Sequence, residues 1–199
     1  MEFSEVVSAR RMVRAYDPRP VPPELVDQVL EAGRRAPSAG NSQGWAFVVL
    51  EGPEQTQRFW DVTLPERKRA TFRWQQLLDA PVIILPLADR QAYLDRYREP
   101  DKVASGLGDA DNWPVPYWQI DTAFATMSIL LAATDAGLGS LFFGVFRKGE
   151  DLLAHLGVPE SFELIGAIAM GYPAEADEPG RSAARGRRPV DHVVHRGGW

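Results

Sequence analysis

Cysteine is absent from the 199-residue chain, and histidine occurs only three times. Without a thiol, a disulfide framework, a thiolate nucleophile and a Cys-ligated metal are all unavailable. His155, His192 and His195 do not pair with carboxylates at the spacing of a helical metal site, and no Gly-x-Ser-x-Gly motif occurs. Hydrolysis by zinc or by a catalytic triad is therefore not indicated. An enzyme of this composition would take its chemistry from a cofactor.

An excess of positive charge is also lacking, since 22 basic residues face 27 acidic ones and the net charge is −5. This balance argues against a general surface for nucleic acid or anionic membranes. The first residues lack the basic-then-apolar order of a signal peptide. The most apolar long stretch, residues 120–137, contains Asp121 and Asp135 and predicts a buried helix rather than a membrane span. We expect a cytoplasmic protein with no nucleic-acid or membrane partner.

The length and composition suit one domain covering residues 1–199. Apolar periodicity predicts helices over residues 22–33, 66–78, 118–137 and 150–156, the second of them polar. Short apolar runs predict strands at residues 46–50, 82–87, 140–143 and 164–170. Residues 98–117 show no periodicity and are predicted to form a lid or substrate loop. Because the order is not βαβαβ, the pattern indicates an α/β or α+β sandwich rather than a Rossmann sheet.

Arginines gather near both ends of the chain. Three lie at positions 10, 11 and 14, and residues 181–199 hold five against one acidic residue, Asp191. Because the planar guanidinium fork suits phosphate oxygens, one hypothesis is that both clusters converge on one phosphate. The alternative is solvated surface charge, which composition alone favours.

Two segments rich in small residues offer a backbone that a flat ligand could approach closely. Residues 35–45 place small residues, hydroxyls and amides, among them Asn41 and Gln43, between a helix end and a strand. A capped turn without a ligand explains this segment equally well. Residues 137–144 carry three glycines, and a helix C-cap explains the first two equally well. Neither Gly-x-Gly-x-x-Gly nor a Walker A spacing occurs, so those nucleotide folds are not indicated.

Several segments together resemble the nitroreductase family. Residues 10–16 (RRMVRAY) resemble its N-terminal RRSVRxY/F signature, and residues 36–45 (APSAGNSQGW) resemble its APSxxNSQPW segment. Further matches follow in the family's order: Asp121-Thr-Ala-Phe-Ala, Gly137-Leu-Gly-Ser with Gly144, Ile168-Ala-Met-Gly-Tyr-Pro, and the ending Arg187–His195. The ordered set spans nearly the whole chain.

The resemblance implies a nitroreductase-like α+β fold, an α/β/α sandwich around a mostly antiparallel sheet. It also implies an intertwined homodimer with FMN at the subunit interface, to which residues 185–199 contribute as an extension that reaches the partner. The implied activity is ping-pong transfer of reducing equivalents from NADH or NADPH to nitroaromatic, quinone or similar electron-poor acceptors. Hydride transfer at flavin N5 needs no catalytic side chain or metal, which agrees with the missing histidine machinery.

The resemblance also implies roles for individual residues. Arg10 would contact the FMN phosphate together with Arg185 and Arg187, because a buried dianion needs several cations. Arg14 would lie at the flavin N1–O2 edge, where a fixed cation raises the reduction potential. The full set of implied cofactor contacts is Arg10, Arg11, Met12, Arg14, Pro37, Ser38, Ala39, Asn41, Arg73, Gln76, Phe143, Gly144, Val145, Arg185 and Arg187.

Within that set, Pro37, Ser38 and Ala39 would line the isoalloxazine of the partner's site, with Asn41 supporting their loop. Gly144 and Val145 would present backbone near flavin N5 and O4. Three further positions depart from the family's pattern, namely Met12 in place of serine and Arg73 and Gln76 where asparagine and lysine are common.

Alternatives to the NAD(P)H-dependent enzyme remain open at this point. A flavin carrier or sensor would bind FMN without turning over nicotinamide. A specialised family member would catalyse flavin fragmentation, dehalogenation or ene reduction. Trp113, Tyr117 and Trp118 in or next to the 98–117 loop either stack an aromatic acceptor or pack that loop against the protein.

Overall fold

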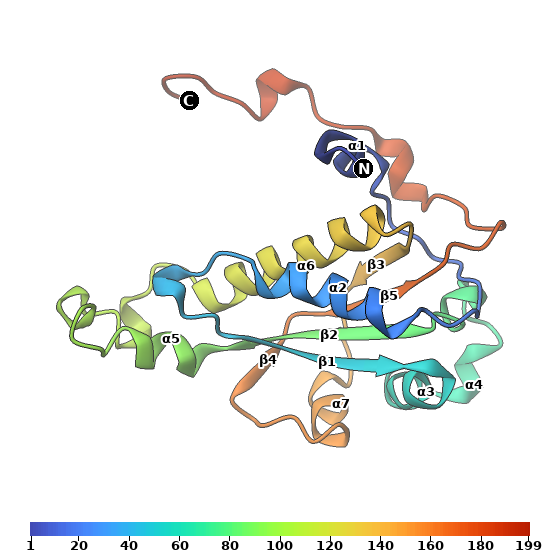
Figure 1. Cartoon of the computed structure of the whole chain (residues 1–199), viewed down its shortest axis with the longest axis horizontal. Coiled ribbons are helices and arrows are strands. Elements are labelled where there is room, and N and C mark those ends of the chain that lie inside the picture. The colour runs from blue at the N-terminus through green and yellow to red at the C-terminus, as the bar shows by residue number, and fades with distance from the viewer.

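A five-stranded antiparallel sheet forms the centre of the molecule (Figure 1) in a computed structural model that describes residues 1–199. The strands are β1 (Trp45–Glu51), β2 (Val82–Asp89), β3 (Gly139–Phe143), β4 (Phe162–Leu164) and β5 (Ala167–Gly171). Their order is β1-β2-β5-β3, and β4 pairs with the far end of β2. Every strand pair is antiparallel, which confirms the predicted character of the sheet.

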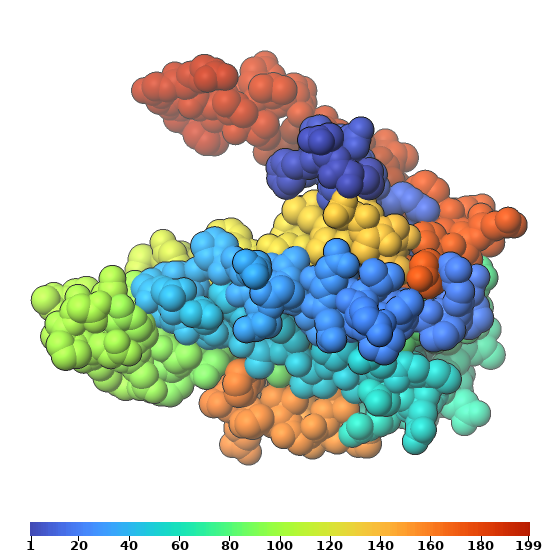
Figure 2. All heavy atoms as spheres, in the orientation of Figure 1, coloured from blue at the N-terminus to red at the C-terminus, as the bar shows by residue number.

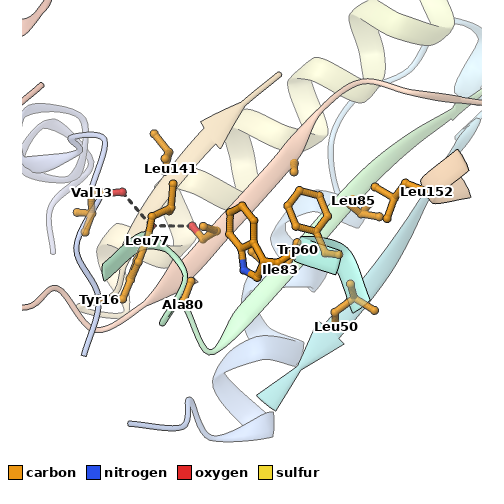
Figure 3. Close-up of a cluster of buried hydrophobic side chains, with 13 residues drawn as sticks. Val13, Tyr16, Leu50, Trp60, Leu77, Ala80, Ile83, Leu85, Leu141 and Leu152 are labelled. Atoms are coloured by element: carbon orange, nitrogen blue, oxygen red, sulfur yellow. Dashed lines mark hydrogen bonds between the residues drawn. The ribbon is translucent and has the colours of Figure 1, made fainter. Parts of the chain in front are cut away.

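Helices cover both faces of this sheet, and as a result β2 is buried on both sides. Alternate residues of a strand point to opposite faces. Ile83 and Leu85 therefore join a core with the helices α3 (Gly52–Thr63) and α7 (Gly149–His155), part of which Figure 3 shows. Ile84 joins a second core with α2 (Pro23–Arg34) and α6 (Tyr117–Asp135). The α/β/α sandwich is thus confirmed, and its layers are visible in Figure 1.

The remaining elements lie at the ends of the sandwich or outside it. They are α1 (Phe3–Ala9), α4 (Glu66–Arg69), α5 (Arg90–Arg96) and the 3-10 turns η1 (Ala39–Asn41), η2 (Gln75–Leu77), η3 (Val103–Ser105), η4 (Ala110–Asn112), η5 (Arg181–Arg185) and η6 (Val190–His192). The C-terminal tail leaves the body beside α1 and projects from it (Figure 2). None of the helices is both long and apolar enough to cross a bilayer.

The predicted polar helix over residues 66–78 is wrong. Only α4 and the turn η2 form there. The side chain of Gln75, the first residue of η2, donates hydrogen bonds to the carbonyl oxygens of Arg69 and Phe72, both at 2.6 Å, and these bonds stabilise a non-helical bend between α4 and η2. The bend directs Phe72 and Trp74 into the wall of a cavity.

The predicted strand over residues 164–170 is two strands, β4 and β5, which separate at Gly166. A Cβ at Gly166 would lie 2.7 Å from the Phe142 ring, so only glycine allows the backbone to pass this ring between β4 and β5. Helices α1, α3 and α5 were not predicted. The Gly52-Pro53 pair follows β1 directly and begins α3, because proline suits a first helical turn.

Candidate cofactor site

The N-terminal segment that carries the predicted arginines adds to the edge of the sheet. Met12 forms a parallel bridge with Ser140 of β3, and the Val13 N–H donates to the Ser140 carbonyl at 3.0 Å. Gly139 makes this contact possible, since a Cβ there would lie 2.7 Å from a Val13 methyl carbon. The backbone around Arg10–Arg14 is therefore fixed relative to β3.

Tyr16 anchors the same segment to strand β5 (Figure 3). Its ring is fully buried, and its hydroxyl donates to the carbonyl oxygens of Val13 at 3.0 Å and Ala169 at 2.9 Å. Burial raises the pKa of Tyr16 well above its ordinary value, and the nearby Asp177 charge adds to the shift. The phenol is consequently neutral and holds the segment through these two hydrogen bonds.

Arginines from both ends of the chain line one cavity of about 690 Å³. Arg10, Arg11, Met12 and Arg14 form its N-terminal side. The other side is formed by Pro179, Gly180, Ser182, Ala183, Gly186 and Arg187. Arg185 lies on η5 next to this cavity but does not line it. The predicted convergence of the two arginine clusters is therefore present within a single chain.

Two further cavities adjoin the first around Arg14. One, of about 460 Å³, has mostly apolar and aromatic walls, among them Trp60 and Trp74, and includes Phe143, Gly144 and Val145. The other, of about 220 Å³, is lined by Arg14, Arg73, Trp74 and Gln76. Arg14 borders all three, so it lies between a cationic cavity and an apolar one. Ten of the fifteen predicted contacts lie around this set: Arg10, Arg11, Met12, Arg14, Arg73, Gln76, Phe143, Gly144, Val145 and Arg187.

The donors in this site suit a planar heterocycle with a phosphate. The amide N–H groups of Gly144 and Val145 donate to no group of the chain. The indole N–H of Trp60 is buried without a partner in the wall of the apolar cavity. Unpaired donors beside aromatic walls match the acceptor-rich edge and the flat faces of a flavin.

The loop of Pro37, Ser38, Ala39 and Asn41, predicted to line the isoalloxazine of the partner's site, lies away from the cavities of its own chain. It follows α2, whose twelve residues span about 18 Å, and it lies beside α5 at the opposite end of the sandwich (Figure 1). Gly40, Asn41 and Gln43 all have positive φ, and the Asn41 side chain accepts a hydrogen bond from that of Gln43 at 3.3 Å. Ser38 Oγ accepts from the Gln43 N–H at 2.9 Å, so the loop is a rigid turn.

A buried carboxylate fixes this loop to α6. The Asp121 side chain, part of the Asp-Thr-Ala-Phe-Ala match, accepts from the Ala39 N–H and from the Tyr93 hydroxyl, both at 2.8 Å. Burial raises the pKa of Tyr93, and the hydrogen bond to Asp121 adds to the shift. The sequence singled out Asp121 only by resemblance, and Tyr93 carried no signal in the sequence.

Most of residues 98–117, predicted to form a lid or substrate loop, are exposed, and Trp113 is the one buried residue among them. Its indole N–H donates to the Leu107 carbonyl at 2.7 Å. Trp118 is also buried and donates to Glu163. Both tryptophans therefore pack the loop against the protein, whereas Tyr117 is partly exposed.

An antiparallel sheet between two helical layers, with the N-terminal segment at its edge, defines a nitroreductase-type α+β sandwich. The model of the nitroreductase family matches residues 7–172, and the chain belongs to this family.

Relatives cover the whole chain. One from Archaeoglobus fulgidus is 31% identical over 201 residues, covering 100% of this chain and 99% of its own; its name offers NADH dehydrogenase and NAD(P)H nitroreductase as candidate activities. Iodotyrosine deiodinase 1 of Rattus norvegicus is 28% identical, covering 87% of this chain and 62% of that protein. A solved structure from Desulfovibrio desulfuricans, in complex with FMN, has a TM-score of 0.70 at 25% identity, covering 100% of this chain and 98% of that one.

Proposed function

We propose that this protein binds FMN and passes reducing equivalents from NADH or NADPH to nitroaromatic, quinone or similar electron-poor acceptors by a ping-pong mechanism. One observation carries the proposal: Arg14 joins a cavity lined by Arg10 and Arg187 to an apolar cavity lined by Gly144 and Val145. The FMN complex of the Desulfovibrio desulfuricans structure and the name of the Archaeoglobus fulgidus relative support it.

In this proposal the chain's own groups bind and orient the cofactor. Arg10 and Arg187 hold the phosphate, with Arg185 joining from η5. Arg14 lies at the pyrimidine edge, where its fixed charge favours the reduced form. The free amides of Gly144 and Val145 donate to the edge near N5. FMN supplies hydride transfer at N5 when bound.

We further propose that a second copy of the chain completes the site. Apolar side chains are exposed on α1 and α6, with Phe3 73% and Phe124 49% exposed, and in the tail, with Val190 73% exposed. Exposed apolar surface of this kind marks an interaction site. A partner covering α1 and α6 could bring its own residues 36–41 to the cavities, and residues 185–199 would reach across to it.

The test is spectroscopic. Purified protein supplied with FMN should be yellow, and NADH or NADPH should bleach its flavin absorbance without oxygen. Flavin that bleaches with dithionite but with neither nicotinamide would indicate a carrier or sensor instead. Protein that stays colourless with excess FMN would contradict the proposal.

Reductive dehalogenation is a second candidate, favoured by the similarity to iodotyrosine deiodinase 1 over 87% of this chain. The two activities separate on reduced protein. Reoxidation by 3-iodotyrosine with release of one iodide per flavin would favour dehalogenation. Reoxidation by nitrobenzene derivatives or quinones without a reaction with 3-iodotyrosine would favour the first proposal.

A further inference from the structure

Asp177 has an unusual environment for an acidic residue. Its side chain is 1% exposed, and it lines the small cavity together with Arg14 and Arg73. One oxygen, Oδ1, accepts from the backbone N–H groups of Arg14 at 2.7 Å and Ala15 at 2.9 Å. The other, Oδ2, is paired with the Arg11 guanidinium. A charged group buried this deeply is stable only with such a set of donors.

Gly180, three residues further on, contacts the other end of Arg14. A Cβ at Gly180 would lie 3.0 Å from the Arg14 Cζ and Nη1 atoms, so the guanidinium packs directly on this glycine. Arg14 Nη1 also donates to the Met12 carbonyl at 3.1 Å, and the guanidinium lies 5.5 Å from the centre of the Trp74 ring. Residues 177–180 therefore hold both the backbone and the side chain of Arg14.

We infer that Asp177 and Gly180 are positioning residues that fix the Arg14 guanidinium where the three cavities meet. The inference rests on the proposed function, in which Arg14 lies beside the flavin N1–O2 edge. Asp177 holds the backbone of Arg14 with a carboxylate, and Gly180 leaves room for the guanidinium. Neither contacts the reacting atoms; each acts through Arg14.

The flavin midpoint potential distinguishes this role from a direct charge effect. Loss of the Asp177 negative charge alone would raise the potential, because the reduced flavin is the more negative form. Release of Arg14 from the pyrimidine edge would lower it, because a fixed cation there stabilises the reduced flavin. The sign of the shift therefore tells whether Asp177 acts through Arg14.

The experiment compares full-length variants loaded with FMN. Asp177→Ala should raise the FMN Kd about tenfold and lower the potential; a tenfold greater loss for reduced than for oxidised FMN corresponds to about 30 mV. Asp177→Asn keeps a carbonyl oxygen as acceptor for the two backbone amides. Its midpoint potential should therefore lie much closer to the wild-type value than that of Asp177→Ala. Gly180→Ala, at φ −61 and ψ 150, is tolerated by the backbone and should lower the potential without any change of charge.

Matched controls lie outside the three cavities. Glu175→Gln removes an exposed charge, and Gly149→Ala adds a methyl group that meets only Leu164, at 3.8 Å. Both should leave Kd and potential unchanged. In an Arg14→Ala background, Asp177→Ala should cause no further fall in potential.

A raised or unchanged potential in FMN-loaded Asp177→Ala and Gly180→Ala would overturn the inference while leaving the proposed function intact. If Asp177→Ala is insoluble, Gly180→Ala decides the question by the same criterion, and a raised potential in Asp177→Asn would indicate a direct charge effect and overturn the inference. A wild-type protein that ignores FMN would contradict both.

Discussion

Arginines around the cationic cavity differ in whether their charge is already used. Arg11 is paired with the buried Asp177, whereas Arg10 and Arg187 take part in no ion pair. A hydrogen bond to a charged group contributes about 1.5–3 kcal/mol. The unpaired arginines are thus the ones with charge to offer a phosphate.

Arg10→Gln and Arg187→Gln should each raise the FMN Kd by roughly tenfold or more, because each removes a charge-assisted hydrogen bond to the phosphate. Fluorescence quenching of FMN measures the affinity. Arg188→Gln, on a residue that donates to the His192 carbonyl in the tail, is the matched control and should change it little. Equal effects of Arg187→Gln and Arg188→Gln would remove the phosphate role from Arg187.

Tyr16→Phe should lower the free energy of unfolding by about 1 kcal/mol, since two buried carbonyl oxygens lose their donor. The pKa of the Tyr16 phenol is raised in the folded state. Its contribution to the free energy of unfolding is therefore complete below about pH 10, the pKa in the unfolded state, and is lost as the pH rises through the folded-state pKa. The melting temperature should fall less steeply between pH 8 and 11 for Tyr16→Phe than for the wild type. Parallel curves would show that Tyr16 ionisation does not contribute.

At the scale of elements, α5 connects two loops that the sequence assigned to separate roles. Arg96 donates to the Gly40 carbonyl at 2.9 Å and to both carboxylate oxygens of Asp101 at 2.7 Å. The first contact lies in the predicted flavin-lining turn and the second in the predicted acceptor loop. Arg96 therefore couples the positions of both loops.

Asp101→Asn should increase hydrogen exchange in residues 99–112 and at Gly40–Asn41, because it removes the bidentate pair. The hydrogen bond from Arg96 lowers the pKa of Asp101, so the pair is intact above about pH 4 and is lost as the pH falls through the folded value. The wild type should therefore approach the variant's exchange pattern in acid. Asp111→Asn, in the same loop, is the control. Unchanged exchange in Asp101→Asn would show that packing of Trp113 alone holds the loop.

Strongly periodic elements could be predicted from the sequence, and elements fixed by tertiary contacts could not. Helix α6 and strand β2 follow from their apolar patterns within a few residues. The bend at residues 70–74 depends on the Gln75 side-chain bonds, and the break at Gly166 depends on the Phe142 ring, neither of which local spacing contains.

The candidate site divides in the same way. Arginines at both ends and the glycines at either end of β3, Gly137, Gly139 and Gly144, were identified from residue type and motif order. Asp177 and Gly180 carried no signal, because their roles arise only when residues 177–180 fold against Arg14. Their importance depends on contacts between segments more than 160 positions apart.

At the scale of the whole molecule, the C-terminal tail, residues 181–199, makes few contacts with the rest of its own chain. All residues from 181 to 199 are exposed, including Trp199, and the segment projects from the body (Figure 2). Burial of apolar residues such as Val190 and Val193 against another surface would be favourable, because it removes apolar surface from water. A second copy of the chain is the partner that the exposed faces of α1 and α6 favour.

Removal of residues 186–199 should leave the core folded, since no buried residue is lost. It should also convert a dimer into a monomer and raise the FMN Kd at least tenfold, because Arg187 and the tail contacts are removed together. Analytical ultracentrifugation and FMN titration measure the two effects. A truncated protein that remains dimeric with full FMN affinity would contradict the proposed role of the tail.

The central claim is that arginines from both ends of the chain meet around one flavin, and a crystal structure of the protein with FMN tests it most directly. The account predicts the phosphate within hydrogen-bond distance of Arg10 and Arg187, the pyrimidine edge against Arg14, and the partner's residues 37–39 on the ring system. A flavin bound elsewhere, or crystals grown with excess FMN that contain none, would contradict it.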